Sequence, residues 1–368
     1  MNKTSFNASL CHGGNILTYG CNNGIIDFSA NINPAGLCKN AVKILKDFKK
    51  IRFFTENYPE TYPKSFIKTL SDYHNIDKRF IHTGAGATDL IFNIVDIFKP
   101  ATVVIVEPSF AEYERAALVS QSKIIHINTH PSEGFELKEK SLSSLLERIN
   151  KIGENDLVFI SNPSNPAGII TFKDTLTEIL NRLKKKGAFL VLDESFMDFC
   201  EEFSAKHMIK YCDNLIVIRS LTKFFAMPGQ RLGYTLADHR IIRKLAETTA
   251  PWKATSLGTE IASASLTDAE YILNTLKLID KLKKDLRVKI ERLKTFQIIP
   301  GTANFFLLKI TNAGEFNALD LKKYLIKSRI LIRYCGNYRG LNNKYFRIAI
   351  RKKSENDYLI KKLKEFIS

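Results

Sequence analysis

Several features that mark other classes of protein are missing from this chain of 368 residues. Its first residues, Met1 to Asn7, are polar, and no apolar run of signal-peptide length follows them. No apolar run reaches the length of about 18 residues that a transmembrane helix requires. We therefore expect a cytoplasmic protein without a membrane partner.

The chain also lacks the cysteine spacings of metal and redox sites. Its six cysteines are scattered, and no pair has the C-x-x-C arrangement. A cytoplasmic chain of this length does not need disulfides for its stability. We predict no metal site and six reduced thiols, at Cys11, Cys21, Cys38, Cys200, Cys212 and Cys335.

Acidic residues are fewer than basic ones, 38 against 55, which gives a formal net charge of +17. Such a charge could indicate a polyanionic partner. However, the lysines between Lys277 and Lys294 interleave with Leu and Ile, as on the solvated face of an amphipathic helix. No nucleic-acid-binding motif accompanies them. We therefore expect no nucleic-acid partner and favour a lysine-rich surface with a cationic pocket for an anionic substrate.

No internal repeat or Pro/Gly/Ser-rich linker divides the chain. From about Thr102 to Leu236, short β-branched runs alternate with longer stretches of helical period, such as Phe172–Lys186. This alternation predicts an α/β protein with a mostly parallel sheet that is covered on both faces. Ligands of such sheets bind at the carboxyl ends of the strands. The predicted strands are Thr102–Val106, Ile124–Ile127, Leu157–Ile160, Phe189–Leu192 and Leu215–Ile218.

A different order of elements follows. A long lysine-rich helix, about Asp268–Leu293, precedes a second group of strands with one more helix, which suits a smaller α+β domain. The strands are Asn304–Ile310, Ile330–Arg333 and Tyr345–Ile350, and the helix is Ala318–Ser328. We divide the chain into an N-terminal arm packing with the small domain (1–40), a large domain (41–250) and a small domain (251–368). The arm has no clear helical or strand period, and we expect it to drape over the site or a neighbouring subunit.

Four loops at predicted strand ends or helix starts carry complementary chemical groups. The first, residues 82–89 with the sequence HTGAGATD, opens a helix predicted at Asp89–Phe98. Glycines allow close backbone approach, and the N–H groups of a helix N-terminus favour an anion. A plain glycine-rich turn explains the same residues equally well. The third glycine of the dinucleotide fingerprint is absent, which counts against a nicotinamide site.

The second loop, residues 161–168 with the sequence SNPSNPAG, follows a predicted strand. Its two prolines fix the backbone and present Asn165, whose amide can donate to an oxyanion. A simple turn remains an equal alternative at this point.

The third feature is a carboxylate at the end of a predicted strand, in the sequence Asp193-Glu194-Ser195. An acid at this edge of the sheet is costly to bury unless a cation accompanies it. A protonated ring nitrogen would meet that need for Asp193. The alternative role, capping the start of a helix, suits Glu194 or Ser195 better than Asp193.

The fourth loop contains Lys223, in RSLTKF at 219–224, and is followed by Arg231, in GQRLGY. Lys223 stands among hydroxyl and apolar residues after a buried strand, unlike the surface lysines elsewhere. Desolvation and nearby cations lower the pKa of such an amine and make it nucleophilic. Together the four loops offer an anion cradle, an amide donor, a carboxylate for a ring nitrogen and an amine for an aldehyde. Pyridoxal 5'-phosphate (PLP) requires this set.

With these motifs, the whole chain resembles the fold-type I PLP-dependent transferases. It is most similar to the histidinol-phosphate aminotransferase branch and, within it, to the threonine-phosphate decarboxylases of cobamide biosynthesis. The narrower resemblance rests on HGGN at 12–15, DFSANINP at 27–34, PSFAEY at 108–113, RSLTKF at 219–224 and the stretch 329–351. It implies a large domain with a mostly parallel seven-stranded sheet, a smaller α+β domain and a homodimer with shared sites.

The resemblance also implies roles for individual residues. Lys223 would bind the cofactor aldehyde covalently and later move protons, and Asp193 would hold the ring nitrogen. Asn165 would donate to the phenolate oxygen of the ring. The ring would stack on Phe110, with Tyr113 nearby. The cofactor phosphate would be bound by Ala85, Gly86, Ala87, Thr88, Ser220, Thr222 and Arg231, and by Tyr58 from the other subunit.

For the substrate, the resemblance assigns Arg347 to the α-carboxylate and Arg333 to a phosphate group. His12 and Asn31 would complete the phosphate pocket, and Asn165 would also contact the substrate. From the residues alone, both arginines could also be surface charges on an edge strand. For His12, the residues alone favour a flexible N-terminal residue.

One departure from the typical aminotransferase pattern is informative. Phe196 stands where those enzymes carry a tyrosine whose hydroxyl donates to the phenolate oxygen of the cofactor. Phe196 cannot donate, so Asn165 would act alone, as it does in the decarboxylase branch that the chain resembles.

The implied reaction is decarboxylation of L-threonine O-3-phosphate to (R)-1-amino-2-propanol O-2-phosphate, a precursor in cobalamin biosynthesis. Three alternatives stay open. The first is a decarboxylase of L-serine O-phosphate that gives ethanolamine phosphate for a norcobamide. The second is an aminotransferase of the histidinol-phosphate type, and the third is a non-catalytic protein that only binds PLP.

Overall fold

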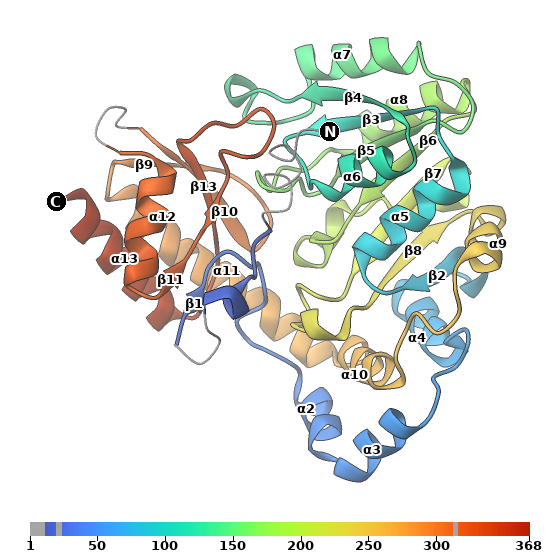
Figure 1. Cartoon of the computed structure of the whole chain (residues 1–368), viewed down its shortest axis with the longest axis horizontal. Helices are drawn as coiled ribbons and strands as arrows, with labels where there is room; N and C mark the ends of the chain where they lie inside the picture. Colours follow the sequence, from blue (N-terminus) through green and yellow to red (C-terminus); the bar gives the residue numbers. More distant parts are fainter. Residues whose placement is uncertain (1–11, 20–23, 312–315) are drawn as a thin grey trace.

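The computed structural model describes residues 12–19, 24–311 and 316–368. They form two bodies side by side, a larger one around a seven-stranded sheet and a smaller one around a four-stranded sheet (Figure 1). Cys11 and Cys21 lie outside the described residues, and the described cysteines, Cys38, Cys200, Cys212 and Cys335, are free thiols. Within these ranges, no helix combines the length and the apolarity needed to span a bilayer.

Seven strands build the large sheet in the order β2-β8-β7-β6-β5-β3-β4. Only β8 runs antiparallel to its neighbours, so the predicted mostly parallel seven-stranded sheet is confirmed. Periodicity alone located five of these strands and missed β2 and β8, which are short and contain glycine and threonine. The strands are β2 (Ile81–Gly84), β3 (Thr102–Glu107), β4 (Lys123–Asn128), β5 (Leu157–Ser161), β6 (Phe189–Asp193), β7 (Leu215–Ser220) and β8 (Gly233–Ala237).

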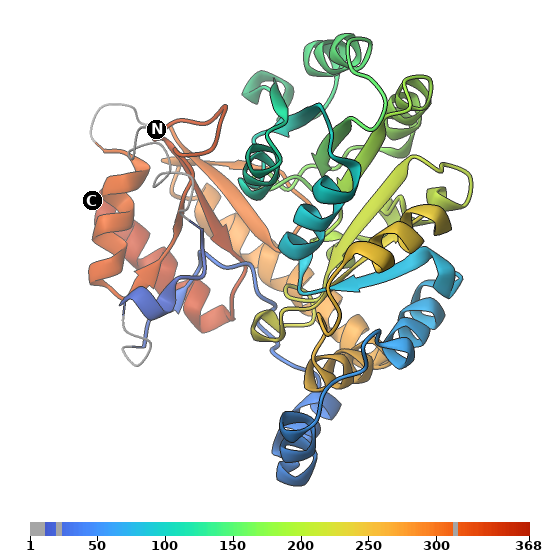
Figure 2. The same cartoon turned by 45° about the vertical axis from the view of Figure 1, so that its right-hand side comes forward.

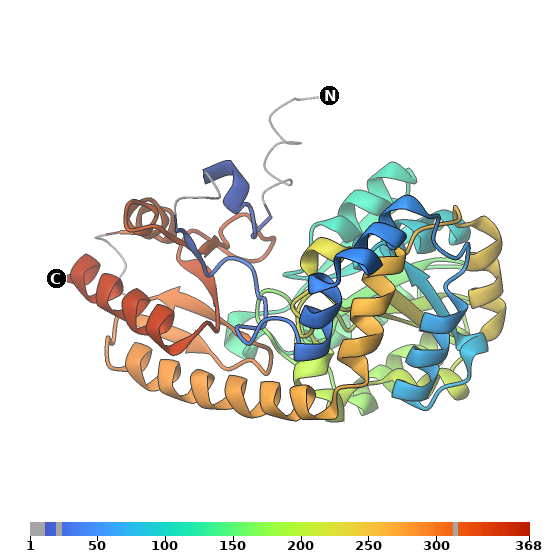
Figure 3. The same cartoon turned by 90° about the horizontal axis from the view of Figure 1, so that it is seen from below.

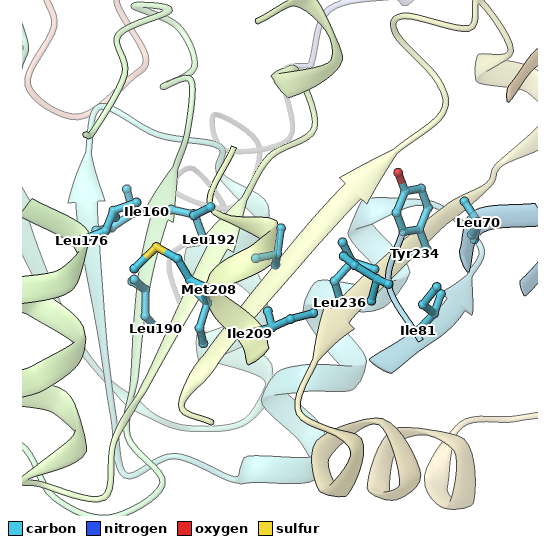
Figure 4. Close-up of a cluster of buried hydrophobic side chains, with 14 of the residues drawn as sticks. Leu70, Ile81, Ile160, Leu176, Leu190, Leu192, Met208, Ile209, Tyr234 and Leu236 are labelled. Carbon is cyan, nitrogen blue, oxygen red and sulfur yellow. The ribbon is translucent and has the colours of Figure 1, made fainter. Parts of the chain in front are cut away.

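Helices cover both faces of the large sheet. Along β6, Leu190 and Leu192 pack into one hydrophobic cluster and Val191 packs into another, as expected for a strand buried on both sides. Figure 4 shows part of the first cluster, with Leu70 beside Tyr234. On that face lie α4 (Lys64–His74), α7 (Glu139–Ile149), α8 (Lys173–Lys184) and α10 (Ser256–Leu266), and on the other α5 (Ala87–Phe98), α6 (Glu112–Val119) and α9 (His239–Thr248).

The smaller body is an antiparallel sheet in the order β12-β13-β10-β9 with three helices packed on it. The long helix α11 (Ala269–Glu291) buries Ile279, Leu282, Leu286 and Ile290 at helical spacing and runs along both bodies (Figure 3). The remaining elements are β9 (Phe296–Ile299), β10 (Phe305–Ile310), β12 (Arg333–Tyr334), β13 (Tyr345–Ala349), α12 (Ala318–Lys327) and α13 (Lys353–Ile367).

The N-terminal arm contributes a strand that its sequence did not predict. β1 (Ile26–Asp27) pairs in parallel with β11 (Ile330–Leu331). The predicted single strand Ile330–Arg333 is therefore two short strands, because β11 pairs with β1 whereas β12 pairs with β13. A two-residue strand is too short to give a recognisable period, which explains why β1 was missed.

Two helices after the arm, α2 (Lys39–Lys46) and α3 (Phe48–Glu56), project from the large body and contact α10 (Figure 2). The predicted domain division at residue 250 precedes α10. However, Ile261, Ala262 and Leu266 of α10 are buried in a cluster of the large sheet. The domain limits stay a prediction, and this packing favours a division within α11.

Candidate active site

A cavity of about 230 Å³ lies at the carboxyl ends of β5, β6 and β7, where the large sheet faces the small body and the N-terminal arm. Tyr58, Ala85 and Gly86 are not among its lining residues. All the other predicted site residues line the cavity: His12, Asn31, Ala87, Thr88, Phe110, Tyr113, Asn165, Asp193, Ser220, Thr222, Lys223, Arg231, Arg333 and Arg347. The strand ends therefore bring the four predicted loops together in one place.

One end of the cavity is the start of α5. The helix begins at Ala87, so the N–H groups of Ala87 and Thr88 lie in the first turn, where the helix itself supplies no acceptor. Gly86 has a φ of +90°, and a Cβ there would lie 2.8 Å from Nη2 of Arg231. Only glycine therefore lets the Arg231 guanidinium approach this helix start. The combination of a cation and free N–H groups suits a phosphate.

Ala85, predicted to bind the same phosphate, is engaged elsewhere. Its N–H donates to Oδ2 of Asp89 at 2.9 Å. Asp89 in turn pairs with Lys253 at 2.6 Å. The Asp89 side chain therefore folds back onto the loop and occupies the Ala85 N–H, and phosphate binding by Ala85 stays a prediction. No local pattern indicated this arrangement, since Lys253 is 164 residues away from Asp89.

Asp193, at the end of β6, is buried and held by two donors. The Tyr113 hydroxyl donates to its Oδ2 at 2.6 Å, and the Ser195 N–H donates to its Oδ1 at 2.9 Å. Burial nevertheless raises the pKa of the Asp193 carboxyl. A bound cation would offset that desolvation. Tyr113, predicted only to lie near the cofactor ring, stacks on Phe159 at 5.0 Å and orients the carboxylate.

Lys223 follows β7 and is partly buried. Burial lowers the pKa of its amine to about 8, and the positive charges of Arg347 and Arg231 contribute. At pH 7 an amine with this pKa is neutral in about one molecule in ten, against fewer than about one in a thousand for an ordinary lysine. Because the neutral amine is the nucleophile, Lys223 can attack an aldehyde under physiological conditions.

Two arginines form the opposite wall. Arg333 and Arg347 are direct cross-strand partners on β12 and β13, and both are buried. Within the described part of the chain, their hydrogen-bond acceptors are all neutral amide or carbonyl oxygens. Burial lowers the pKa of Arg347, and its buried Nε has no acceptor there. Adjacent buried cations without acidic partners favour a ligand with two anionic groups.

The N-terminal arm closes the cavity beside these arginines. Nε2 of His12 lies 2.8 Å from Oε1 of Glu112, and this hydrogen bond holds the pKa of the Glu112 carboxyl below its usual range. A Cβ on Gly13 would lie 2.3 Å from the Ser29 carbonyl oxygen, so glycine is needed for the arm to pack this closely. Asn31 brings a buried Oδ1 that has no partner among the described residues.

Phe196 contributes an apolar wall to the cavity. Its ring meets Phe305 edge to face at 5.2 Å, and the Arg347 guanidinium lies 5.2 Å above the Phe305 ring. Nη1 of Arg347 donates to Oδ1 of Asn165. Nδ2 therefore remains as the Asn165 donor for an oxyanion.

A buried ion network behind the cavity was missed at the sequence level. Arg219, which is completely buried, lies 3.2 Å from Glu194, 3.3 Å from Asp198 and 2.6 Å from Glu201. Glu194 directly follows Asp193, so the network joins the ends of β6 and β7. A charged residue at the end of each of two apolar strands, Glu194 after β6 and Arg219 in β7, was the sequence signal that could have revealed this network.

The donor set fits PLP. The α5 start and Arg231 suit its phosphate, Asp193 suits a protonated ring nitrogen, and Lys223 suits its aldehyde. Phe110 supplies an aromatic face in the same cavity. The roles of the individual residues remain proposals.

Comparison with known proteins gives consistent matches. The family described as aminotransferase class I and II matches residues 23–363. The threonine-phosphate decarboxylase of Salmonella typhimurium is 32% identical over 97% of this chain and 96% of that protein. The adenosylcobalamin biosynthesis bifunctional protein CobDQ of Leptospira interrogans is 30% identical over 95% of this chain and 40% of that protein. The crystal structure of the histidinol-phosphate aminotransferase from Clostridium acetobutylicum superimposes with a TM-score of 0.82 at 28% identity, over 92% of this chain and 98% of that one.

Proposed function

The chain belongs to the aminotransferase class I and II family, whose members use PLP, and we propose that it decarboxylates L-threonine O-3-phosphate to (R)-1-amino-2-propanol O-2-phosphate. One observation carries this proposal. Arg333 and Arg347 lie in the Lys223 cavity and, within the described residues, donate only to neutral acceptors. A small molecule with both a carboxylate and a phosphate would neutralise them. Similarity to a bifunctional protein of adenosylcobalamin biosynthesis supports a role for this chain in that pathway.

The cofactor-facing residues would each perform one task. Bound PLP supplies an aldehyde for amino groups and a ring that accepts the electron pair of a breaking bond at the α-carbon. Asp193, oriented by Tyr113, keeps the ring nitrogen protonated. Nδ2 of Asn165 donates to the phenolate oxygen. Phe110 provides the stacking face.

The substrate-facing residues would fix the orientation in which the reaction occurs. Arg347 binds the α-carboxylate, and Arg333 binds the phosphate together with His12 and Asn31. Holding both ends would restrict rotation at the α-carbon and would fix which of its bonds is presented for cleavage, here the bond to the carboxylate. Lys223 would deliver a proton to the α-carbon after CO2 has left.

Substrate comparison tests the proposal. The holoenzyme is incubated with O-phospho-L-threonine, O-phospho-L-serine or histidinol phosphate, each with and without 2-oxoglutarate. We expect CO2 from phosphothreonine without any 2-oxo acid. A fitted methyl pocket would favour phosphothreonine over phosphoserine by about tenfold or more in kcat/KM. Glutamate formation from 2-oxoglutarate and histidinol phosphate, without CO2 release, would instead identify an aminotransferase.

We also propose that the protein is a homodimer in which Tyr58 reaches the cofactor phosphate of the other subunit. Tyr58 is 86% exposed, beside Trp252 at 5.4 Å, and it does not line the cavity of its own chain. Phe48 and Phe53 on the projecting α3 are also exposed. Apolar side chains gathered on a projecting element favour a protein interface.

Sedimentation of point variants tests the dimer. Phe53→Glu is expected to yield monomers that bind PLP at least about tenfold more weakly, because the partner's contact with the phosphate is lost. Phe172→Glu is the matched control, since Phe172 is equally exposed but lies at the start of α8. A monomeric wild-type protein that is fully active would contradict the proposal.

We place the enzyme in the cytoplasm, because its described cysteines are free and Cys212 is partly exposed. Exposed thiols persist in a reducing compartment. Detection of the protein in an extracytoplasmic fraction would contradict this assignment.

A further inference from the structure

Arg333 is held on several sides by the segment that connects β12 and β13. Its Nη1 donates to Oδ1 of Asn337 at 3.0 Å and to the carbonyl oxygen of Tyr334. The centre of its guanidinium lies 4.8 Å above the ring of Tyr338. The Tyr338 N–H donates to the Cys335 carbonyl oxygen at 3.0 Å, which fixes the turn that carries the ring.

These contacts leave only part of the Arg333 guanidinium for a ligand. Two acceptors occupy Nη1, and the Tyr338 ring covers one face. The edge formed by Nε and Nη2 remains, and no described residue offers a hydrogen-bond acceptor to it. Such an edge binds two oxygens of one oxyanion in parallel. Arg347 differs, because both of its terminal nitrogens already donate, to Asn165 and to Ser29.

Tyr338 also separates two hollows. It lines the active-site cavity and an adjoining cavity of about 290 Å³, and Arg333 and His12 line both. Without the ring, the guanidinium would gain room to turn toward the adjoining cavity. An arginine side chain that is free to turn must lose rotamer freedom when it binds a ligand, which weakens binding.

We propose that Tyr338 is a positioning residue that determines specificity. Its ring, with Asn337, holds Arg333 so that the Nε and Nη2 edge faces the cavity and selects a phosphorylated amino acid over an unphosphorylated one. The identity of the substrate rests on the function proposed above. The positioning itself concerns only how the cavity binds phosphate.

The proposed positioning depends on the aromatic ring of Tyr338 and not on its hydroxyl group. Tyr338→Phe keeps the aromatic face and is expected to behave like the wild type. Tyr338→Leu keeps apolar bulk but loses the cation–π contact. It should raise the KM for O-phospho-L-threonine about fivefold to tenfold, with kcat changed less than about twofold.

Phosphate binding supplies a readout that is independent of turnover. Calorimetry on the PLP-loaded protein, whose cofactor cradle is already filled, gives the Kd of inorganic phosphate at the Arg333 site. Tyr338→Leu should raise this Kd by the same factor as the KM, and Tyr338→Phe should leave it unchanged. Tyr358→Leu is the matched control, because Tyr358 lies under Lys362 at 5.8 Å on α13, outside the cavity.

The outcomes separate the two proposals. Weaker phosphate binding by Tyr338→Leu, without any turnover of phosphothreonine by the wild type, would support the positioning role and reject the proposed function. Equal phosphate Kd values for wild type and a folded Tyr338→Leu protein would overturn the positioning role. It would also be overturned if Tyr338→Phe were as defective as Tyr338→Leu.

Discussion

Replacing Lys223 with methionine is expected to lower kcat/KM for phosphothreonine at least about a thousandfold. The variant keeps the length of the side chain but loses the amine that we propose captures the aldehyde and later protonates the α-carbon. Initial rates of CO2 release measure the loss. Borohydride reduction followed by mass spectrometry should find the pyridoxyl group on Lys223 in the wild type and on no residue of the variant.

Lys283 provides the matched control for this experiment. It is another mostly buried lysine, and burial lowers its pKa to about 8 as well. However, its amine donates to the carbonyl oxygens of Gly301 and Ala303 and does not line the active-site cavity. Lys283→Met should keep covalently attached cofactor. If Lys223→Met retained the adduct and Lys283→Met lost it, the nucleophile would be assigned wrongly.

Replacing Arg219 with methionine is expected to lower the free energy of unfolding by about 3–5 kcal/mol at neutral pH, because Glu194, Asp198 and Glu201 would lose their shared cation. Urea denaturation followed by fluorescence measures the effect. Arg182→Met is the control, since Arg182 forms only an exposed pair with Glu178 and should cost at most about 1 kcal/mol. An Arg219 variant as stable as the Arg182 variant would contradict the role of the network.

The same network predicts the sign of a pH effect. Burial raises the pKa of Asp198 to about 7 in the folded protein, above the value of 3.8 expected when unfolded. A carboxyl with a raised pKa contributes stability below its unfolded pKa and loses it as the pH rises through about 7. Without the Arg219 cation, burial would disfavour the ionised form of these carboxyl groups more strongly, and their pKa values would rise further. The destabilisation of Arg219→Met should therefore be smaller at pH 5 than at pH 8.

Strands buried on both faces were predictable from sequence, because such strands need an unbroken apolar run. The apolar runs Leu157–Ile160 and Leu215–Ile218 illustrate this, since every residue of both is buried. β2 was not predicted from the sequence, because His82 and Thr83 interrupt its apolar run. The segment from Ile330 to Tyr334 reads as one strand, and only the structure reveals that its two halves pair with different partners.

The position of the cavity could be predicted more readily than the contacts between the side chains that line it. Parallel strands end at one edge of a sheet, so Asn165, Asp193 and Lys223 were expected to meet there. The partners that tune them come from distant segments. The Tyr113 hydroxyl reaches Asp193 across 80 residues, and the Arg347 guanidinium reaches Asn165 across 182. No periodicity or spacing rule encodes such pairs.

The fate of the substrate's carboxylate carbon distinguishes decarboxylation from transamination. The holoenzyme is incubated in D2O with O-phospho-L-threonine carrying ¹³C in its carboxylate, without any 2-oxo acid. We predict that the label leaves as bicarbonate, in proportion to an amino alcohol phosphate that carries one deuterium at the former α-carbon. If the label stayed in an organic 2-oxo acid while the cofactor took its amine form, the enzyme would be an aminotransferase and the account of its reaction would be wrong.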